Sequence, residues 1–224
     1  NNDFGGDLEG ADEVWDGETA TEPTLVTDTA TGEEYYSITK ASELAGFAAM
    51  VNGTTTLGRS VTTPETMNFK LEGNIDLGNY EWTPIGTTAN PFTGIFDGDG
   101  FTIKNLTVTG YNSNVGLFGD TRDGEIKNLI VENAKISGRL NVGVVSGQPY
   151  TSKYTNITVK GHVEVNGMAY VGGVGGKNAY ANWEKITVDV DASSYVNANS
   201  VEDGTAYRTY VGGVIGFNGE GSHS

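Results

Sequence analysis

The sequence predicts an all-β fold, a right-handed parallel β-helix whose short strands wind into stacked coils. Two motifs recur in one register, separated by Gly, Asn and charged turn residues. The first motif reads NVGLFG at 114–119, NVGVVSG at 141–147, YVGGVGG at 170–176 and YVGGVIG at 210–216. The second reads IKNLTV at 103–108, IKNLIV at 126–131, TNITV at 155–159 and EKITV at 184–188. Alternating β-branched residues within both motifs indicate strands.

The spacing of the repeats indicates the size of one coil. The first valines of the four VG motifs are separated by 27, 29 and 40 residues. Such a repeat is too short for a domain, but three short strands per repeat make one solenoid coil, stacked about 4.8 Å from the next. After residue 53 no helical pattern of ten residues occurs, which argues against leucine-rich or ankyrin arrays.

Two kinds of residue mark the predicted bends of each coil. A glycine follows the inward valine, and it permits a bend through positive φ or through close backbone approach. An asparagine marks the bend in the second motif, because Asn tolerates the left-handed conformation, and stacked copies would form an amide ladder that stops at Lys185. These structural repeat positions are Gly116, Gly143, Gly172 and Gly212, together with Asn105, Asn128 and Asn156.

A helix is expected before the repeats. Within residues 37–51 the apolar side chains at 44, 47, 48 and 51 lie on one helical face. Thr39 is the expected N-cap, and Asn52-Gly53 is a suitable stop. A helix across the open end of a solenoid would protect its unpaired strand edges, so we assign it as the N-terminal cap.

The organisation along the chain follows from these elements and from charge. Residues 1–34 hold eleven acidic side chains and no Lys or Arg, which predicts a flexible tether. The remaining segments are predicted to be the capping helix region at 35–53, irregular first coils at 54–100, repeat coils at 101–217 and a tail at 218–224.

Composition excludes several classes of function. The net charge of −16, concentrated in the acidic segment, disfavours nucleic acid and anionic lipid as partners. No run of 18 apolar residues occurs, so no membrane-spanning helix is expected. The chain has no cysteine, so disulfides and thiolate metal sites are excluded. The sequence opens without a signal-peptide pattern, and we expect that segment to have been removed or to lie outside the sequence given.

One long stretch carries a family resemblance. The run LEGNIDLGNYEWTPIGTTANPFTGIFDGDGFTIKNLTV at 71–108, with the later VGLFG and VGGVIG segments, resembles the GLUG-repeat proteins of Bacteroides-type bacteria. The similarity covers roughly residues 37–217, and the repeat is named from bacterial immunoglobulin A-specific metallopeptidases. It implies GLUG-type coils and an exported protein at the outer-membrane surface or extracellular, often an adhesin-like lipoprotein. A lipid anchor would lie outside the given sequence, and without an HExxH motif no peptidase chemistry carries over.

Carboxylates and one histidine are the candidates for catalytic or metal-binding residues. The Asp97-Gly98-Asp99-Gly100 segment lacks the ligand spacing of an EF-hand and is interpreted as a turn. His162 stands alone, without the partners of a metal site or a catalytic triad. The two other acidic pairs are Asp120/Asp123 and Asp189/Asp191. We predict no catalytic residue, no metal and no cofactor.

Aromatic residues give the stronger binding argument. Tyr170 and Tyr210 share the slot before VGG, and stacked coils place their rings side by side as a structural ladder or as a surface for a sugar or a protein partner. The longest repeat gap adds a loop within 191–209, and loops on a rigid scaffold commonly carry binding. The candidate ligand-binding residues are Tyr170, Tyr210, Tyr195, Tyr207 and Arg208. Tyr154 and Trp183 share a slot with Ile103 and Ile126 and are expected in the core.

Two classes of function are compatible with these features. The hypothesis favoured here is a non-catalytic bacterial cell-surface adhesin, or a module that binds a host glycan, a surface or matrix protein or another cell-surface component. The alternative is the non-catalytic repeat region of a secreted peptidase-like or polysaccharide-degrading enzyme. A third hypothesis is a spacer whose active part lies outside the sequence given.

Overall fold

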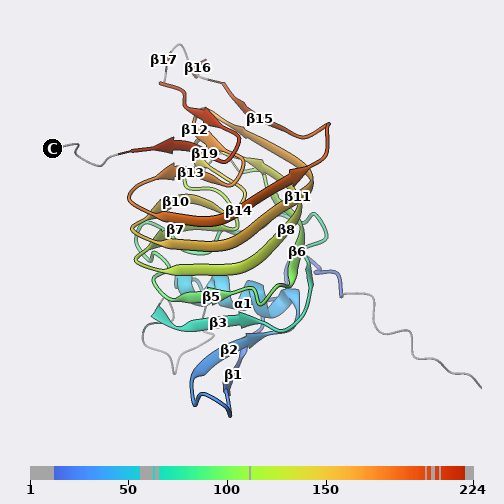
Figure 1. Ribbon diagram of the computed structural model, residues 1–224. Coiled ribbons are helices and arrows are strands. Elements are labelled where there is room, and N and C mark those ends of the chain that lie inside the picture. Colours follow the sequence, from blue (N-terminus) through green and yellow to red (C-terminus); the bar gives the residue numbers. More distant parts are fainter. Residues whose placement is uncertain are drawn as a thin grey trace, which may run out of the picture.

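The computed structural model describes residues 13–55, 63, 66–110, 112–199, 201–202, 205–206 and 208–219. These residues form a right-handed parallel β-helix of about five turns, which confirms the predicted fold class (Figure 1). The coils stack along one axis, with the N-terminal hairpin at one end and the strands after β14 at the other. In the described ranges, no helix is both long enough and apolar enough to cross a membrane.

Three parallel sheets form the walls of the coils. The largest contains β1 (Thr24–Thr27), β2 (Glu34–Ile38), β3 (Asn68–Leu71), β4 (Ile75–Asp76), β5 (Ile95–Asp97), β6 (Thr102–Val108), β8 (Glu125–Ser137), β11 (Lys153–Gly167), β14 (Asn182–Val190) and β15 (Tyr195–Ala198). The second contains β7 (Phe118–Arg122), β10 (Ser146–Tyr150), β13 (Gly175–Asn178) and β19 (Ile215–Asn218). The third contains β9 (Leu140–Val142), β12 (Ala169–Gly172) and β18 (Val211–Gly212), and a separate antiparallel pair is β16 (Val201–Glu202) with β17 (Thr205–Ala206).

The register of the largest sheet corrects one predicted alignment. Ile103 pairs with Val131 rather than with Ile126, whose partner in the preceding coil is Phe96. The long strand β8 turns a corner, so β5 and β6 both pair with it, one along each half. Tyr154 is fully buried in the column of Ile126, as expected, but Ile103 does not belong to that column.

Asn105 therefore stands apart from the other predicted ladder asparagines. Its Nδ2 donates to Asp76 Oδ1 at 2.8 Å, in the column of β4 and β6. Asn128 and Asn156 do stack, because Asn156 Nδ2 donates to Asn128 Oδ1 at 3.1 Å. All three have left-handed backbones, with φ between 52° and 60°. The motif recurs because both corners of the coil need a left-handed residue, and sequence similarity alone cannot separate the two columns.

Lys185 occupies the ladder position above Asn156 and keeps the left-handed backbone, with φ of 55°. This conformation costs most residues other than Gly, Asn and Asp roughly 1 kcal/mol or more. Replacing Lys185 with Asn is expected to raise the free energy of unfolding by about 1 kcal/mol, because the backbone relaxes and the amide can donate to Asn156. Urea denaturation measures this as a higher midpoint at an unchanged m-value. Lys185→Gln removes the same charge without the left-handed preference, and an equal gain in that variant would contradict the explanation.

The four glycines after the valines stack, and close approach explains them rather than positive φ. Val142 pairs with Val115 and with Val171, so each glycine follows a stacked valine. None of the four has positive φ. A Cβ on Gly143 would lie 2.7 Å from the Gly175 Cα, and one on Gly116 would lie 2.4 Å from the Gly143 carbonyl oxygen. The bend therefore brings backbones so close that no side chain fits.

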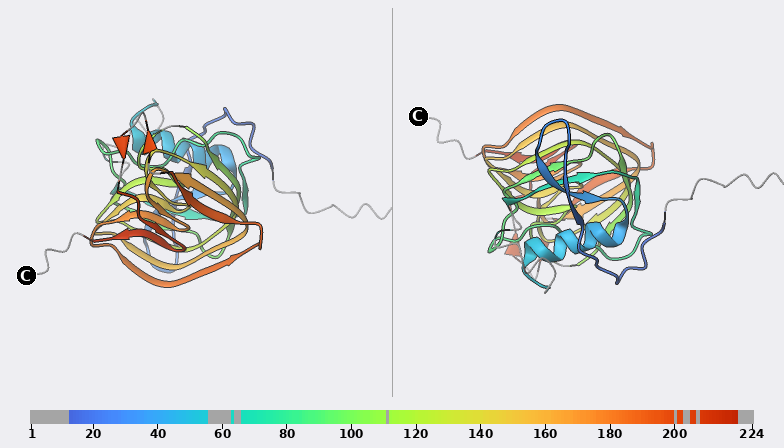
Figure 2. Two further views of the ribbon diagram at one scale, coloured as in Figure 1. Left: turned by 90° about the horizontal axis from the view of Figure 1, so that it is seen from above. Right: turned by 90° about the horizontal axis from the view of Figure 1, so that it is seen from below.

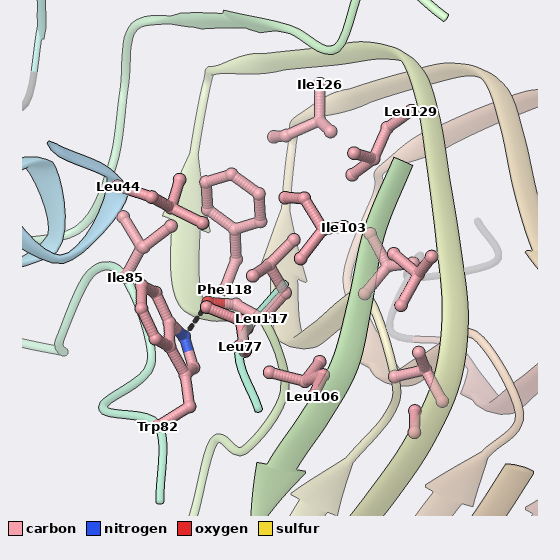
Figure 3. Packing of buried hydrophobic residues seen from close by; sticks show 14 of the residues in the cluster. Leu44, Leu77, Trp82, Ile85, Ile103, Leu106, Leu117, Phe118, Ile126 and Leu129 are labelled. Carbon is pink, nitrogen blue, oxygen red and sulfur yellow. Dashed lines mark hydrogen bonds between the residues drawn. The ribbon is translucent and has the colours of Figure 1, made fainter. Parts of the chain in front are cut away.

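The core fills the tube between the sheets, as Figure 3 shows for Leu44, Ile103, Phe118 and their neighbours. Trp82 is buried there, and its indole Nε1 donates to the Leu117 carbonyl oxygen at 3.2 Å. Such a buried N–H needs a partner, because an unpaired one loses its hydration without replacement.

Side chains on facing walls of the core complement one another in size. Phe118, Ser146 and Gly175 occupy one column of the second sheet. The opposite wall carries Ile126, Tyr154 and Trp183 in one column. A Cβ on Gly175 would lie 2.9 Å from the Trp183 ring, so the large ring occupies the space that the glycine leaves empty. Volume is thus conserved from coil to coil while the residues change.

Helix α1 (Ala41–Asn52) lies at the N-terminal end of the solenoid (Figure 2, right). Its Phe47 ring stacks on Phe69 with centroids 3.8 Å apart. The N-cap is Lys40 and not Thr39, but the Thr39 N–H and hydroxyl both donate to Glu43 Oε2 at 2.8 and 2.9 Å. Gly53 ends the helix with a left-handed φ of 68°.

The predicted tether differs from the structure over residues 13–34. Trp15 is buried at 8% exposure, its N–H donates to the Asp76 carbonyl oxygen at 2.9 Å, and its ring meets Trp82 edge-on. β1 pairs antiparallel with β2 and covers the first edge of the sheet. A few apolar anchors outweigh the acidic side chains, which stay in solvent. Residues 1–12 lie outside the described residues.

The opposite end of the solenoid presents apolar side chains to solvent in the described part of the chain. Val188 and Val190 of β14 and Val211 and Val214 near β18 are each between 38% and 50% exposed. The equivalent Val159 in the coil below is fully buried. Val188 and Val211 thus continue columns that are buried in the coil below, at Val159 and Val171.

Candidate functional site

Two columns of side chains run next to each other along the coils beside the VG bends. The first column is Asn114, Asn141, Tyr170 and Tyr210. The second column is Asp120, Gln148, Lys177 and Phe217. All are partly exposed except Asp120, which is buried. We call these eight residues the amide–tyrosine stripe.

The aromatic half of the stripe brings together two predicted binding residues. Tyr170 and Tyr210 stack with ring centroids 5.4 Å apart and planes 5° apart. Phe217 meets both rings edge-on, at 5.2 and 4.7 Å, and the Lys177 Nζ lies 5.5 Å from the Tyr170 centroid. One face of each ring is therefore covered by the other ring, as in the ladder interpretation. Their edges and hydroxyls, and the outer face of Tyr210, are the parts left for a ligand.

The first column bends through left-handed residues. Asn114, Asn141 and Tyr170 have φ of 60°, 55° and 57°. Asn adopts this conformation readily, but tyrosine does so at a cost of roughly 1 kcal/mol or more. At this position the structure thus has a tyrosine, although asparagine would adopt the left-handed backbone at a lower free-energy cost. Strained positions of this kind are concentrated at functional sites.

The polar half of the stripe is a chain of amides. Asn141 Nδ2 donates to Asn114 Oδ1 at 2.6 Å and to Gln148 Oε1 at 3.3 Å. Asn114 Nδ2 in turn donates to Thr88 Oγ1 at 3.3 Å. Asn114 and Thr88 line an open cavity of about 220 Å³ that begins where the stripe ends. The amides give the stripe fixed donors and acceptors beside the aromatic rings.

Asp120 is the most unusual residue of the stripe. It is 1% exposed, and neither carboxylate oxygen has a hydrogen-bond partner among the described residues. Burial raises the pKa of the Asp120 carboxyl, and the nearby Arg122 charge and Thr88 hydroxyl lower it less strongly. The Thr88 hydroxyl does not reach hydrogen-bonding geometry with either oxygen.

The other predicted binding residues lie apart from the stripe or next to its end. Tyr195 belongs to β15 of the largest sheet, where it is 43% exposed and its hydroxyl accepts from Asn166 Nδ2 at 3.4 Å. Arg208 is exposed two residues before Tyr210. Tyr207 lies outside the described residues.

The acidic pairs considered for metal binding are mostly engaged with cations or exposed. Asp99 pairs with Lys70 Nζ at 3.1 Å, and Asp97 pairs with Lys127 Nζ at 3.5 Å. Asp189 and Asp191 are exposed. Among the described residues, no cluster of three or more His, Asp or Glu side chains could hold a metal ion.

His162 is not isolated, although it was expected to stand alone. Its Nε2 lies 3.1 Å from Glu164 Oε1, and its Nδ1 lies 3.1 Å from Ser193 Oγ. The His162 contact, with Lys135 nearby, lowers the pKa of the Glu164 carboxyl. The Ser193 hydroxyl, the His162 imidazole and the Glu164 carboxylate thus form a row of three hydrogen-bonded side chains, in which Ser193 is exposed and the His162 side chain is 43% exposed.

A second aromatic cluster was missed by the sequence reasoning. Tyr150 and Tyr180 are 37% and 55% exposed and meet edge-to-face at 6.0 Å. The Arg122 guanidinium lies 5.5 Å from the Tyr150 ring centroid. Arg122 and Tyr150 are register partners 28 residues apart, so the repeat spacing would have predicted that these two residues are neighbours.

Comparison with known proteins gives one partial similarity. Over 130 residues the chain is 32% identical to Halomucin of Haloquadratum walsbyi, a match that covers 51% of this chain but 1% of Halomucin. The chain therefore spans only a small fraction of that protein. No protein-family model matches the sequence, and no solved structure matches the chain significantly.

Proposed function

We propose that this chain is a non-catalytic, adhesin-like module that acts outside the cell and binds a glycan or a glycosylated surface protein. The observation that carries the proposal is the amide–tyrosine stripe, in which Tyr170, Tyr210 and Phe217 adjoin Lys177 and a chain of amides. Sugars present apolar C–H faces and hydroxyls together, so a site for them combines aromatic surface with fixed donors and acceptors.

Three further features support the proposal. The stripe lies on sheets whose strands are locked by parallel pairing, so its side chains are held in place before a ligand arrives. Tyr170 keeps a left-handed backbone in a slot where the two preceding coils carry Asn. The resemblance to GLUG-repeat surface proteins of Bacteroides-type bacteria supports export, and on this basis a lipid-anchored adhesin is the form that we propose.

Binding to a combined array of glycans and host matrix proteins tests the proposal. We expect a saturable hit that weakens at least about tenfold in the Tyr170→Asn/Tyr210→Asn variant, because about 1.4 kcal/mol of ring contact corresponds to that factor. This variant restores the residue found in the same slot of two other coils, so the fold is kept. Silence of the well-folded parent across the array would overturn the proposal.

The second aromatic cluster provides the matched control. Tyr150→Ala/Tyr180→Ala removes two exposed rings from another corner of the same coils. Its binding is expected to equal that of the parent chain. Loss of binding in this control, with binding intact in the Tyr170/Tyr210 variant, would move the site to the Arg122 corner and contradict the assignment to the stripe.

A further inference from the structure

The buried carboxylate of Asp120 lacks the partner that other partly or fully buried acids of the solenoid have. Asp76 accepts from Asn105 at 2.8 Å and lies 3.7 Å from Lys104 Nζ, and Asp97 has Asn128 and Lys127. For Asp120 only the backbone is satisfied: its N–H donates to the Gly86 carbonyl oxygen and its carbonyl accepts from the Phe92 N–H. A buried, unpaired charge is among the costliest features in a folded protein.

Arg122 does not act as that partner. It is two residues along the same strand, and its guanidinium lies over the Tyr150 ring at 5.5 Å. Neither Asp120 oxygen has a hydrogen-bond partner among the described residues. A bound cation would supply a positive charge at this site.

The neighbours of Asp120 present further oxygen atoms. Gln148 is its register partner in the next coil, about 4.8 Å away along the axis. Asn141 contacts Gln148, and its own Oδ1 is buried without a partner. The Asn141 amide cannot be turned round to remove this orphan, because Nδ2 donates to Asn114 Oδ1 and Gln148 Oε1. The two Asp120 carboxylate oxygens and Asn141 Oδ1 are thus buried acceptors without a donor among the described residues, in adjoining columns of the stripe.

We propose that Asp120 and Asn141 are ligands of a Ca²⁺ ion bound at the polar end of the amide–tyrosine stripe. Gln148, the register partner of Asp120, and Thr88, which hydrogen-bonds to Asn114, carry further oxygens that would complete the site. A cation there would neutralise the buried charge and provide a partner for the carboxylate oxygens. Ca²⁺ suits the site because it accepts carboxylate and amide oxygens in flexible geometry, whereas Mg²⁺ requires a near-ideal octahedron.

The affinity follows from the ligand charge. A single carboxylate among neutral oxygens predicts weak binding, with a Kd on the order of 10⁻⁴–10⁻³ M, in the range of extracellular modules. Ion binding here does not depend on the proposed glycan binding, and it is measured without any sugar.

Thermal unfolding of the full chain, followed by tryptophan fluorescence, tests the site. In about 10 mM CaCl₂ we expect Tm to rise by about 3–10 °C over NaCl of equal ionic strength, because a ligand that binds only the folded state stabilises it. Asp120→Asn keeps the shape and removes the charge, so the calcium-dependent rise is lost. Without calcium this variant should unfold no earlier than the parent, since it buries no charge.

Two further variants keep the outcome clear. Asp99→Asn alters the acidic segment that most resembles a calcium loop, and the rise is expected to persist because Asp99 is paired with Lys70. Asn141→Asp adds a second carboxylate and should enlarge the calcium-dependent rise. It serves as the deciding variant if Asp120→Asn does not fold. An equal rise in Asp120→Asn, an equal rise with MgCl₂, or no rise in the parent would each overturn the proposal.

Discussion

Replacing Gly143 with alanine is expected to lower the free energy of unfolding by at least about 3 kcal/mol. The added Cβ would lie 2.7 Å from the Gly175 Cα, the Gly176 N and the Ser146 carbonyl oxygen. All three are backbone atoms, so no side chain can rotate away. Adjacent coils would have to separate, and the parallel hydrogen bonds that join β10 to β13 would lengthen with them. Urea denaturation with circular dichroism measures the loss.

Gly213→Ala is the matched control for this prediction. A Cβ on Gly213 would have no atom within 4 Å, and its φ is not positive. The alanine therefore only restricts the unfolded chain, and we expect no destabilisation and a gain of up to about 1 kcal/mol. Similar losses in the two variants would show that backbone contact at Gly143 is not what requires glycine there.

Phe47→Ala is expected to cost about 3–5 kcal/mol, the second large effect. Phe47 is fully buried and stacks on Phe69 at 3.8 Å and Phe96 at 5.8 Å, with Phe92 edge-on at 5.4 Å. The alanine leaves a cavity between α1 and the first coils that rigid backbones on both sides cannot close. Chemical denaturation gives the magnitude.

Phe47→Leu separates the cavity from the loss of aromatic contact. Leucine fills most of the same volume, so its cost should be well below that of alanine. Unchanged stability of the alanine variant would mean that α1 contributes little to the solenoid, contrary to its assignment as the N-terminal cap. If the alanine variant unfolded only in the residues before β5, the transition would show a lower m-value than that of the parent chain.

The fold was predictable because residues one coil apart in a solenoid pair with each other, so the repeat length in the sequence gives the register. Valines 27 and 29 residues apart do pair in neighbouring coils, and the glycines stack with them. The position of Asn105 was not predictable from similarity, since two corners demand the same left-handed residue. The charge of residues 13–34 concealed the packing of Trp15, because composition averages over a segment while one buried ring can anchor it.

The candidate site was predictable in part for the same reason. Tyr170 and Tyr210 share a slot, and equal slots in stacked coils become contacts. Phe217 and Lys177 join them from a different sheet, and no spacing rule connects those positions before the turn geometry is known. The sequence does not single out Asp120, because the lack of hydrogen-bond donors to its carboxylate depends on how the neighbouring side chains are placed.

The complementary side-chain volumes of the two facing core columns affect how such sequences can diverge. Phe118 faces a wall carrying Ile126, whereas Gly175 faces Trp183 in a later coil. A strand of one wall copied by itself from one level to another would bring two rings, or two small residues, into the same layer. Strands of one wall are therefore not interchangeable between levels, although their motifs are alike. Substitutions in one wall are tolerated only when the opposite wall changes with them, so divergence between coils should proceed by linked pairs.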